Sequence, residues 1–285
     1  MDSLTNPTTE ISRSEALRRR YGATPPAGGL PSDGPWNETI ASLLDHRSVR
    51  GFLPDPLPPG TLETLIAAAQ SAATSSNMQL WSAITIDDPA TRQELAAIAG
   101  DQKHIEQCPL YLCWIADLSR NERMGEAEKA DLEALPWLET YTVACIDAAL
   151  AAQNAVVAAN ALGLRTVYIG AMRNDPARVA ELLGLPPRSF VVFGLCVGHA
   201  DPASRHEVKP RLPQSTVLHR ERYDATPERR DRAAYDAELE RFSAHNEMAA
   251  TTWTRRVIAR MGPIAAMNGR ERLRATLARL GFEIR

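Results

Sequence analysis

The chain has 285 residues, of which 44% are hydrophobic, and a formal net charge of −3 at pH 7. It is long and apolar enough for one large or two small packed domains, which excludes an intrinsically disordered protein. Its weakly acidic balance offers no overall attraction to nucleic acid or to an anionic membrane surface. We therefore expect a globular protein that binds neither nucleic acid nor membrane.

Cysteine usage indicates a reducing compartment. Cys108, Cys113, Cys145 and Cys196 lie in apolar stretches and form no Cys-x-x-Cys pair, a pattern typical of buried free thiols rather than of disulfides or a zinc site. The polar N-terminus lacks the apolar run of a secretory signal, and no segment is an uninterrupted apolar span long enough for a bilayer. We expect a cytoplasmic protein with no metal site.

Residues 1–35 are rich in threonine, serine, proline and glycine, with one short helical pattern around 14–20. Segments of this composition bury little apolar surface. We predict a flexible N-terminal extension over 1–35, whose role the sequence does not reveal. It is followed by one domain over 36–285 that ends in a helical region.

The first part of that domain alternates helices with polar connections. A short helix is expected from Trp36 towards His46, and an amphipathic helix over 62–69 follows a proline-rich loop. The second helix ends in Thr74-Ser75-Ser76, whose hydroxyls either reach a ligand or simply form a turn. A strand over 81–87 and a helix from 89 to 100 follow, and Gln102 lies on the connection to an apolar strand over 110–116.

The middle of the chain holds its longest regular segment. Residues 118–137 are charged and irregular, and we expect a mobile insertion or a lid there. A helix is predicted over 141–162, with Ile146 and Leu150 on a stripe of larger apolar residues and alanines over most of the remaining surface. This pattern predicts a buried central helix or a dimer helix. Asp147, Gln153 and Asn154 interrupt it and argue against a membrane span.

The last part continues with strands and then becomes helical. A strand arriving at Gly170 leads to a small-residue turn, where backbone N–H groups can approach a planar ligand. A helix from Pro176 and an apolar strand over 190–197 follow. Helices are expected over 228–242, 253–261 and 270–280. Their arginine-rich end carries no nucleic-acid motif, and we expect it to pack on a second subunit.

Two compact basic clusters stand out. His46-Arg47-Ser48-Val49-Arg50 follows the first helix, and Lys209-Pro210-Arg211 comes far downstream. Each is a set of donors suited to a phosphate and a polar ring edge, which together suggest a flavin nucleotide site. Taken alone, each cluster is also compatible with a solvated surface. His46 is compatible with a general base, a phosphate contact or a structural role.

Motifs for phosphoryl transfer, serine hydrolysis, zinc proteolysis and Rossmann dinucleotide binding are absent from the sequence. Where a protein shows no nucleophile and base, a cofactor can carry the chemistry. A flavin fits that expectation.

An ordered set of short motifs resembles the nitroreductase-fold flavoproteins, of the NfsA/FRP type of NADPH-dependent oxygen-insensitive nitroreductases and flavin reductases. The motifs include His46-Arg47-Ser48-Val49-Arg50, Gly100-Asp101-Gln102, Tyr168-Ile169-Gly170, Phe193-Gly194-Leu195-Cys196 and Lys209-Pro210-Arg211-Leu212-Pro213. The resemblance implies an α+β fold with a mixed central sheet flanked by helices. It also implies an intertwined homodimer with two FMN molecules at the interface.

The resemblance implies a set of cofactor-binding residues, and no catalytic side chain, because flavin N5 carries the hydride. The set is His46, Arg47, Ser48, Arg50, Thr74, Ser75, Ser76, Gln102, Tyr168, Ile169, Gly170, Ala171, Lys209 and Arg211. The basic residues are expected to hold the phosphate and the pyrimidine edge, and the 168–171 backbone to lie against the ring. NADPH or NADH would donate electrons, and nitroaromatics, quinones or free flavins would accept them by two-electron ping-pong chemistry.

The chain departs from the family pattern at two places. Ala171 stands where the family has a second glycine, and residues 244–250, before Trp253, replace an arginine-rich loop that grips the 2′-phosphate of NADPH. The choice between NADPH and NADH is therefore open. Two alternatives also stay open: a flavoenzyme that acts on a dedicated pathway substrate without NADPH, and a flavin-binding module without turnover.

Overall fold

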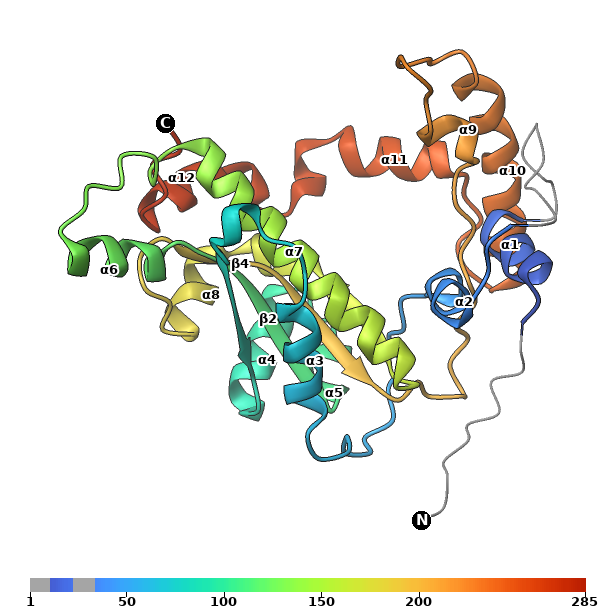
Figure 1. Cartoon of the computed structure of the whole chain (residues 1–285). Coiled ribbons are helices and arrows are strands. Elements are labelled where there is room, and N and C mark those ends of the chain that lie inside the picture. The colour runs from blue at the N-terminus through green and yellow to red at the C-terminus, as the bar shows by residue number, and fades with distance from the viewer. Residues whose placement is uncertain (1–10, 23–33) are drawn as a thin grey trace. The chain divides into compact units, whose positions relative to one another are not determined.

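The computed structural model describes residues 11–22 and 34–285. They form two compact units (Figure 1). Unit 1 comprises the described residues up to Arg47 together with Arg205–Gly262, and unit 2 comprises Ser48–Ser204 together with Pro263–Arg285. The boundary between the units therefore falls inside the first basic cluster, between Arg47 and Ser48. The predicted extension over 1–35 lies partly outside the described residues, and its separation from a 36–285 domain stays a prediction.

Unit 1 is helical in its described part. Its helices are α1 (Arg13–Tyr21), α2 (Glu38–Asp45), α9 (Gln214–Val217), α10 (Glu228–His245) and α11 (Trp253–Met261). The short helix predicted around 14–20 is confirmed as α1, where the Ser12 hydroxyl accepts a hydrogen bond from the Glu15 amide and caps the first turn. α1 packs on α2, and α10 contacts both α9 and α11.

Unit 2 contains the sheet. Its strands are β1 (Trp81–Thr85), β2 (Leu110–Asp117), β3 (Arg165–Ile169) and β4 (Ser189–Gly198), in the order β1-β2-β4-β3. Its helices are α3 (Thr61–Gln70), α4 (Pro89–Ile98), α5 (His104–Gln107), α6 (Ser119–Glu128), α7 (Leu138–Ala161), α8 (Pro176–Leu182) and α12 (Leu273–Arg279). Short 3₁₀ turns are η1 (Ser75–Asn77), η2 (Gly170–Asn174), η3 (Ile264–Met267) and η4 (Arg270–Arg272).

The predicted α+β fold is confirmed, with one refinement of the expected mixed sheet. All three neighbouring strand pairs are antiparallel. Within the described residues, parallel pairing is limited to the isolated bridge of Ser48 to Thr166, beside β3. The sequence shows where strands lie but does not fix their relative direction, which depends on how each connecting helix returns to the sheet.

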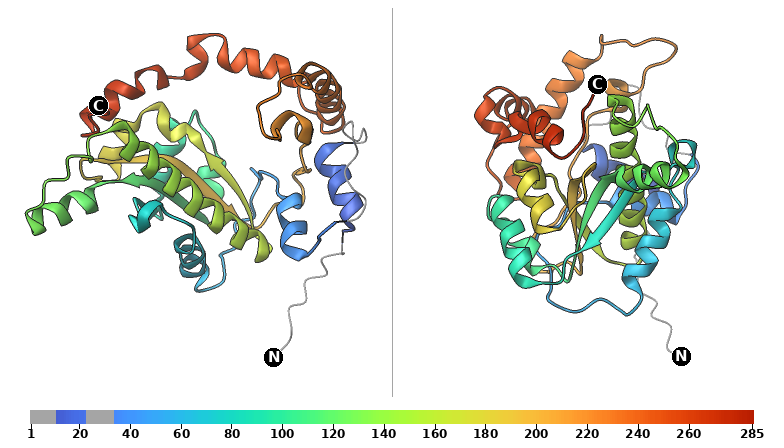
Figure 2. Two further views of the ribbon diagram at one scale, coloured as in Figure 1. Left: turned by 45° about the horizontal axis from the view of Figure 1, so that its top comes forward. Right: turned by 90° about the vertical axis from the view of Figure 1, so that its left-hand side faces the viewer.

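The side chains of β2 point alternately to the two faces of the sheet, and both faces are buried. Leu110, Leu112 and Trp114 pack against α3 and α7, whereas Tyr111 and Cys113 pack against the side of α4, α5 and α8. This alternation follows from the two-residue period of a strand. Figure 2 shows α7 and α3 on one side of the sheet and α4 on the other. Burial on both faces explains why β2 and β4 are continuous apolar runs.

Helix α7 is the one described helix long and apolar enough to cross a membrane by length and composition. Its alanines Ala151, Ala152 and Ala155 are fully buried and lie against the sheet and α3, which identifies α7 as a core helix. The larger residues of the predicted stripe do not form this buried face. Ile146 is 51% exposed and Leu150 is 43% exposed. The buried face consists mainly of alanines, whose small side chains let the helix approach the sheet closely.

The prediction of an irregular insertion over 118–137 was wrong for its first half, where α6 forms. Arg188 donates to Glu122 of α6 at 2.6 Å, and the Ser119 amide donates to Asp117 at 3.0 Å near its start. These contacts join α6 to the end of β2 and to the segment before β4. They compensate for a charged sequence with little apolar periodicity, so local pattern alone could not reveal the helix.

Candidate functional site

The first basic cluster spans the boundary between the two units. His46 and Arg47 follow α2 in unit 1, and Arg47 donates to the Asp45 carboxylate at 2.6 Å. The buried Nε atom of Arg47 has no hydrogen-bond partner among the described residues. A buried donor without a partner costs free energy that a ligand acceptor would recover.

The second basic cluster, Lys209-Pro210-Arg211, also lies in unit 1, and two side chains fix its backbone. The Tyr235 hydroxyl of α10 donates to the Pro210 carbonyl at 2.9 Å. The Arg20 guanidinium of α1 donates to the Lys209 carbonyl at 3.1 Å, and the Arg211 amide donates back to the Arg20 carbonyl at 2.9 Å. The backbone that carries the two cations is therefore held from two helices.

Arg20 also reaches the first cluster. Its Nη2 atom donates to the Leu44 carbonyl at 2.6 Å and to the His46 carbonyl at 2.7 Å. The guanidinium of Arg20 therefore binds the backbone of both segments, 44–47 and 209–211, within unit 1. Arg20 was not among the predicted site residues, because an arginine in an isolated short helix carries no signal of its partners.

A cavity of about 650 Å³ opens inside unit 1, and its lining includes α1, α10, Arg47 and Pro210. The other arginines of its wall are already paired: Arg18 and Arg19 with Glu15, and Arg241 with Glu238. The cavity therefore borders one predicted site residue without adding an unpaired cation of its own.

In unit 2, Ser48, Val49 and Arg50 run extended beside β3. The buried Val49 amide donates to the Thr166 carbonyl at 3.0 Å. Ser48 and Arg50, on either side of Val49, are exposed, as the alternation of an extended backbone requires. Burial, and then the charge of Arg50, lower the pKa of His104.

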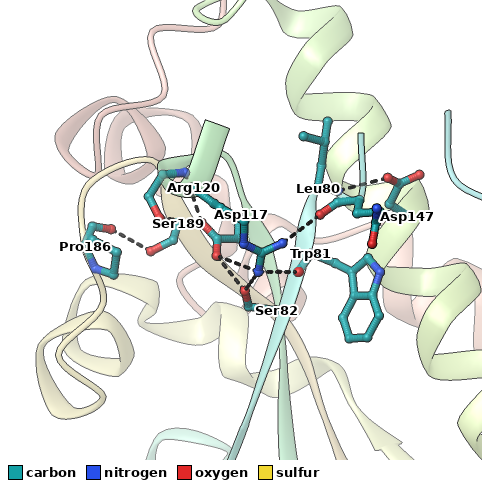
Figure 3. Close-up of polar contacts among 10 residues, drawn as sticks. Leu80, Trp81, Ser82, Asp117, Arg120, Asp147, Pro186 and Ser189 are labelled. Carbon is teal, nitrogen blue, oxygen red and sulfur yellow. Dashed lines mark hydrogen bonds and ion pairs between the residues drawn. The ribbon is translucent and has the colours of Figure 1, made fainter. Parts of the chain in front are cut away.

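The Thr74-Ser75-Ser76 turn is held by a residue of α7. Asp147 accepts hydrogen bonds from the Thr74 hydroxyl at 2.6 Å, from the Ser75 amide at 3.3 Å and from the Leu80 amide at 3.1 Å. Figure 3 shows the Asp147 carboxylate meeting Leu80 at the start of β1. Ser76 has φ of 49°, so the turn leaves the right-handed region. In the sequence, Asp147 is only a polar interruption of an apolar helix, and nothing there indicates this role.

Gln102 lies on the connection between α4 and α5, as predicted, and its side-chain amide donates to the Ala99 carbonyl at 2.8 Å. At the end of β3, Tyr168 packs edge-on against Phe193 with ring centroids 4.9 Å apart, and burial raises its pKa. Gly170 then begins η2, and Ala171 is buried. The predicted ring-facing segment therefore lies where a strand turns into a 3₁₀ helix.

Among residues 11–22 and 34–285, no group of three or more histidine, cysteine or acidic side chains is placed to hold a metal ion. The side chains of the two basic segments of unit 1 are mainly hydrogen-bond donors. One of these donors, the buried Nε atom of Arg47, has no partner among the described residues. This donor set fits a phosphate-bearing cofactor.

Comparison with known proteins gives the family. The model of the Nitroreductase family matches residues 43–199, and that of its C-terminal domain matches residues 209–285. The chain belongs to the nitroreductase family. The resemblance seen in the sequence motifs is therefore confirmed.

Individual members of the nitroreductase family are similar over most of their length. A Bacillus subtilis protein named FMN reductase (NADPH) is 36% identical over 227 residues, which cover 78% of this chain and 90% of the relative. The oxygen-insensitive NADPH nitroreductase of Salmonella typhimurium is 38% identical over 72% of this chain and 82% of its own. The solved structure of B. megaterium NfrA2 superimposes with a TM-score of 0.82, at 37% identity, over 88% of this chain and 100% of its own.

Proposed function

We propose that this member of the nitroreductase family is an FMN-dependent NAD(P)H oxidoreductase that reduces nitroaromatics, quinones or free flavins. Relatives named FMN reductase (NADPH) and oxygen-insensitive NADPH nitroreductase support the reaction class. The observation that carries the proposal is the pair of basic segments bound to one guanidinium in unit 1. Such a concentration of donors matches the phosphate of a flavin nucleotide.

The proposed roles follow the chemistry of each residue. The FMN phosphate would be held by His46, Arg47, Lys209 and Arg211. Ser48 and Arg50, which follow Arg47 in the sequence, would add further donors. Thr74, Ser75, Ser76 and Gln102 would supply further polar contacts, and Tyr168, Ile169, Gly170 and Ala171 would line the ring. When bound, FMN supplies the hydride-transfer chemistry between the nicotinamide and the acceptor. Positive charge from the arginines would stabilise the reduced cofactor.

The electron donor is either NADPH or NADH, and one observation bears on the choice. Before Trp253, His245 lies 3.1 Å from the Glu207 carboxylate, and the Asn246 amide donates to the same carboxylate at 3.1 Å. A carboxylate partner in this segment disfavours a bound 2′-phosphate there. The same observation supports the alternative in which a dedicated pathway substrate replaces NADPH.

We propose a cytoplasmic homodimer. Each unit exposes large apolar side chains: Ile146 and Leu150 on α7 of unit 2, and Ile258 and Met261 on α11 of unit 1. Apolar stripes of this kind on well-formed helices mark protein interfaces. A second copy of the chain would cover them, and an equilibrium mass equal to one 31.2 kDa chain would contradict the dimer.

Steady-state kinetics test the proposed reaction. Initial rates over a matrix of NADPH or NADH and quinone concentrations are expected to give parallel lines in double-reciprocal plots, because donor and acceptor would use one site in turn. Converging lines would contradict a shared site. Absence of turnover with every acceptor class, in protein that retains FMN, would favour the binding module.

A further inference from the structure

Arg20 is a buried cation in a helix that precedes the family match, which begins at residue 43. Its residue is only 7% exposed, yet its guanidinium donates to three carbonyls, those of Leu44, His46 and Lys209. These acceptors belong to two segments far apart in the chain. Each segment carries part of the proposed phosphate site.

The contacts run in both directions along the second segment. Arg20 donates through its side chain to the Lys209 carbonyl and accepts through its own carbonyl from the Arg211 amide at 2.9 Å. Helix α1 therefore holds Lys209 and Arg211 on either side of Pro210. A shift of α1 would move both cations relative to His46.

The charge of Arg20 has no direct ion-pair partner among the described residues. The Asp45 carboxylate is paired with Arg47, and its charge offsets that of Arg20 only from beyond ion-pair distance. Burial, and then the charge of Arg211, lower the pKa of Arg20. A buried cation that meets only neutral carbonyls is costly. A bound anion would reduce this cost.

We propose that Arg20 is a positioning residue that fixes the two basic segments in register for the phosphate of the flavin. Helix α1 is then an integral part of cofactor binding rather than a dispensable extension. This inference rests on the proposed FMN function. Arg20 acts through the backbone of residues 44–46 and 209–211, so it is not itself a catalytic residue.

The test compares FMN with riboflavin, which has the same ring but no phosphate. Both are titrated into the full-length protein, freed of bound flavin, and binding is followed by flavin fluorescence. Arg20→Ala is expected to raise the Kd for FMN by about tenfold to a hundredfold, the scale of lost hydrogen bonds to a charged group. The Kd for riboflavin is expected to stay unchanged.

Arg18→Ala is the matched control, since Arg18 lies on the same helix, is exposed and, within the described part of the chain, pairs only with Glu15. It is expected to bind both flavins as the original protein does. Arg20→Lys keeps the charge on a single head group, and its FMN-to-riboflavin affinity ratio should fall partway towards that of Arg20→Ala. This variant also serves if Arg20→Ala does not fold.

Equal weakening of FMN and riboflavin would show that Arg20 acts on the fold alone and would overturn the proposal. An FMN-to-riboflavin affinity ratio equal to that of the original protein in both Arg20 variants would also overturn the proposal. If the original protein binds neither flavin, the proposed function itself fails, and that outcome is distinct from any effect of Arg20.

Discussion

Replacement of Asp147 by alanine is expected to lower the free energy of unfolding by about 3 kcal/mol, the scale for removing one partner of a buried polar network. Asp147 is only 2% exposed and accepts hydrogen bonds from Thr74, Ser75 and Leu80. Alanine would leave the buried Leu80 amide without its acceptor, together with the part-buried Thr74 hydroxyl and Ser75 amide. The Thr74–Ser76 turn, part of the proposed flavin site, would lose its attachment to α7.

Chemical denaturation with a linear extrapolation measures this loss of stability. Asp147→Asn is expected to lose less stability than Asp147→Ala. Its side-chain carbonyl oxygen still accepts a hydrogen bond, whereas its amide nitrogen would face a donor. Glu139→Ala, an exposed change in the first turn of the same helix, is the matched control and should cost only a few tenths of a kcal/mol. A loss below about 1 kcal/mol for Asp147→Ala would contradict the role given to its carboxylate.

Replacement of Gly194 by alanine is expected to cost about 3 kcal/mol or to prevent accumulation of soluble protein, because it overpacks the core. A Cβ atom at this position of β4 would lie 2.1 Å from the hydroxyl oxygen of Tyr111 and 2.6 Å from the ring carbon that bears it. Tyr111 is fully buried on β2, and its hydroxyl contacts the Met172 sulfur at 3.2 Å. The ring can therefore yield only by displacing its buried neighbours.

Gly184→Ala separates this steric effect from backbone strain. Gly184 has φ of +60°, and a Cβ there would meet no atom within 4 Å, so the expected cost is only that of the left-handed conformation, about 1 kcal/mol. Melting temperatures of the two variants give the comparison. Equal destabilisation by both would contradict the close approach of Gly194 to Tyr111.

Elements with strong local signals were predicted well from the sequence. Asp88 and Asp175 each precede a proline and cap α4 and α8 by accepting from the amide three residues on. β2 and β4 were evident as apolar runs because both of their faces are buried. α6 was missed, since its Glu122 contact with Arg188 joins residues 66 positions apart in the chain. The buried face of α7 was also unclear, because alanines give little contrast in hydropathy.

The candidate site was predictable only in part. The two basic clusters were recognisable from their donors and from their order along the chain. Arg20 and Asp147 were not, because their partners include backbone amides and carbonyls, which every sequence supplies and which only the fold brings into reach. The residues proposed to touch the cofactor thus carry a sequence signal, whereas those that hold them do not.

An anaerobic absorption spectrum of the purified protein, titrated in turn with NADPH and NADH, tests the central claim most directly. We expect a flavin band that is bleached by at least one of the two nucleotides and restored by a quinone. The nucleotide that bleaches it at lower concentration is the preferred donor. A colourless protein that takes up no added FMN would contradict the account, and a bound flavin that neither nucleotide bleaches would exclude the reductase function.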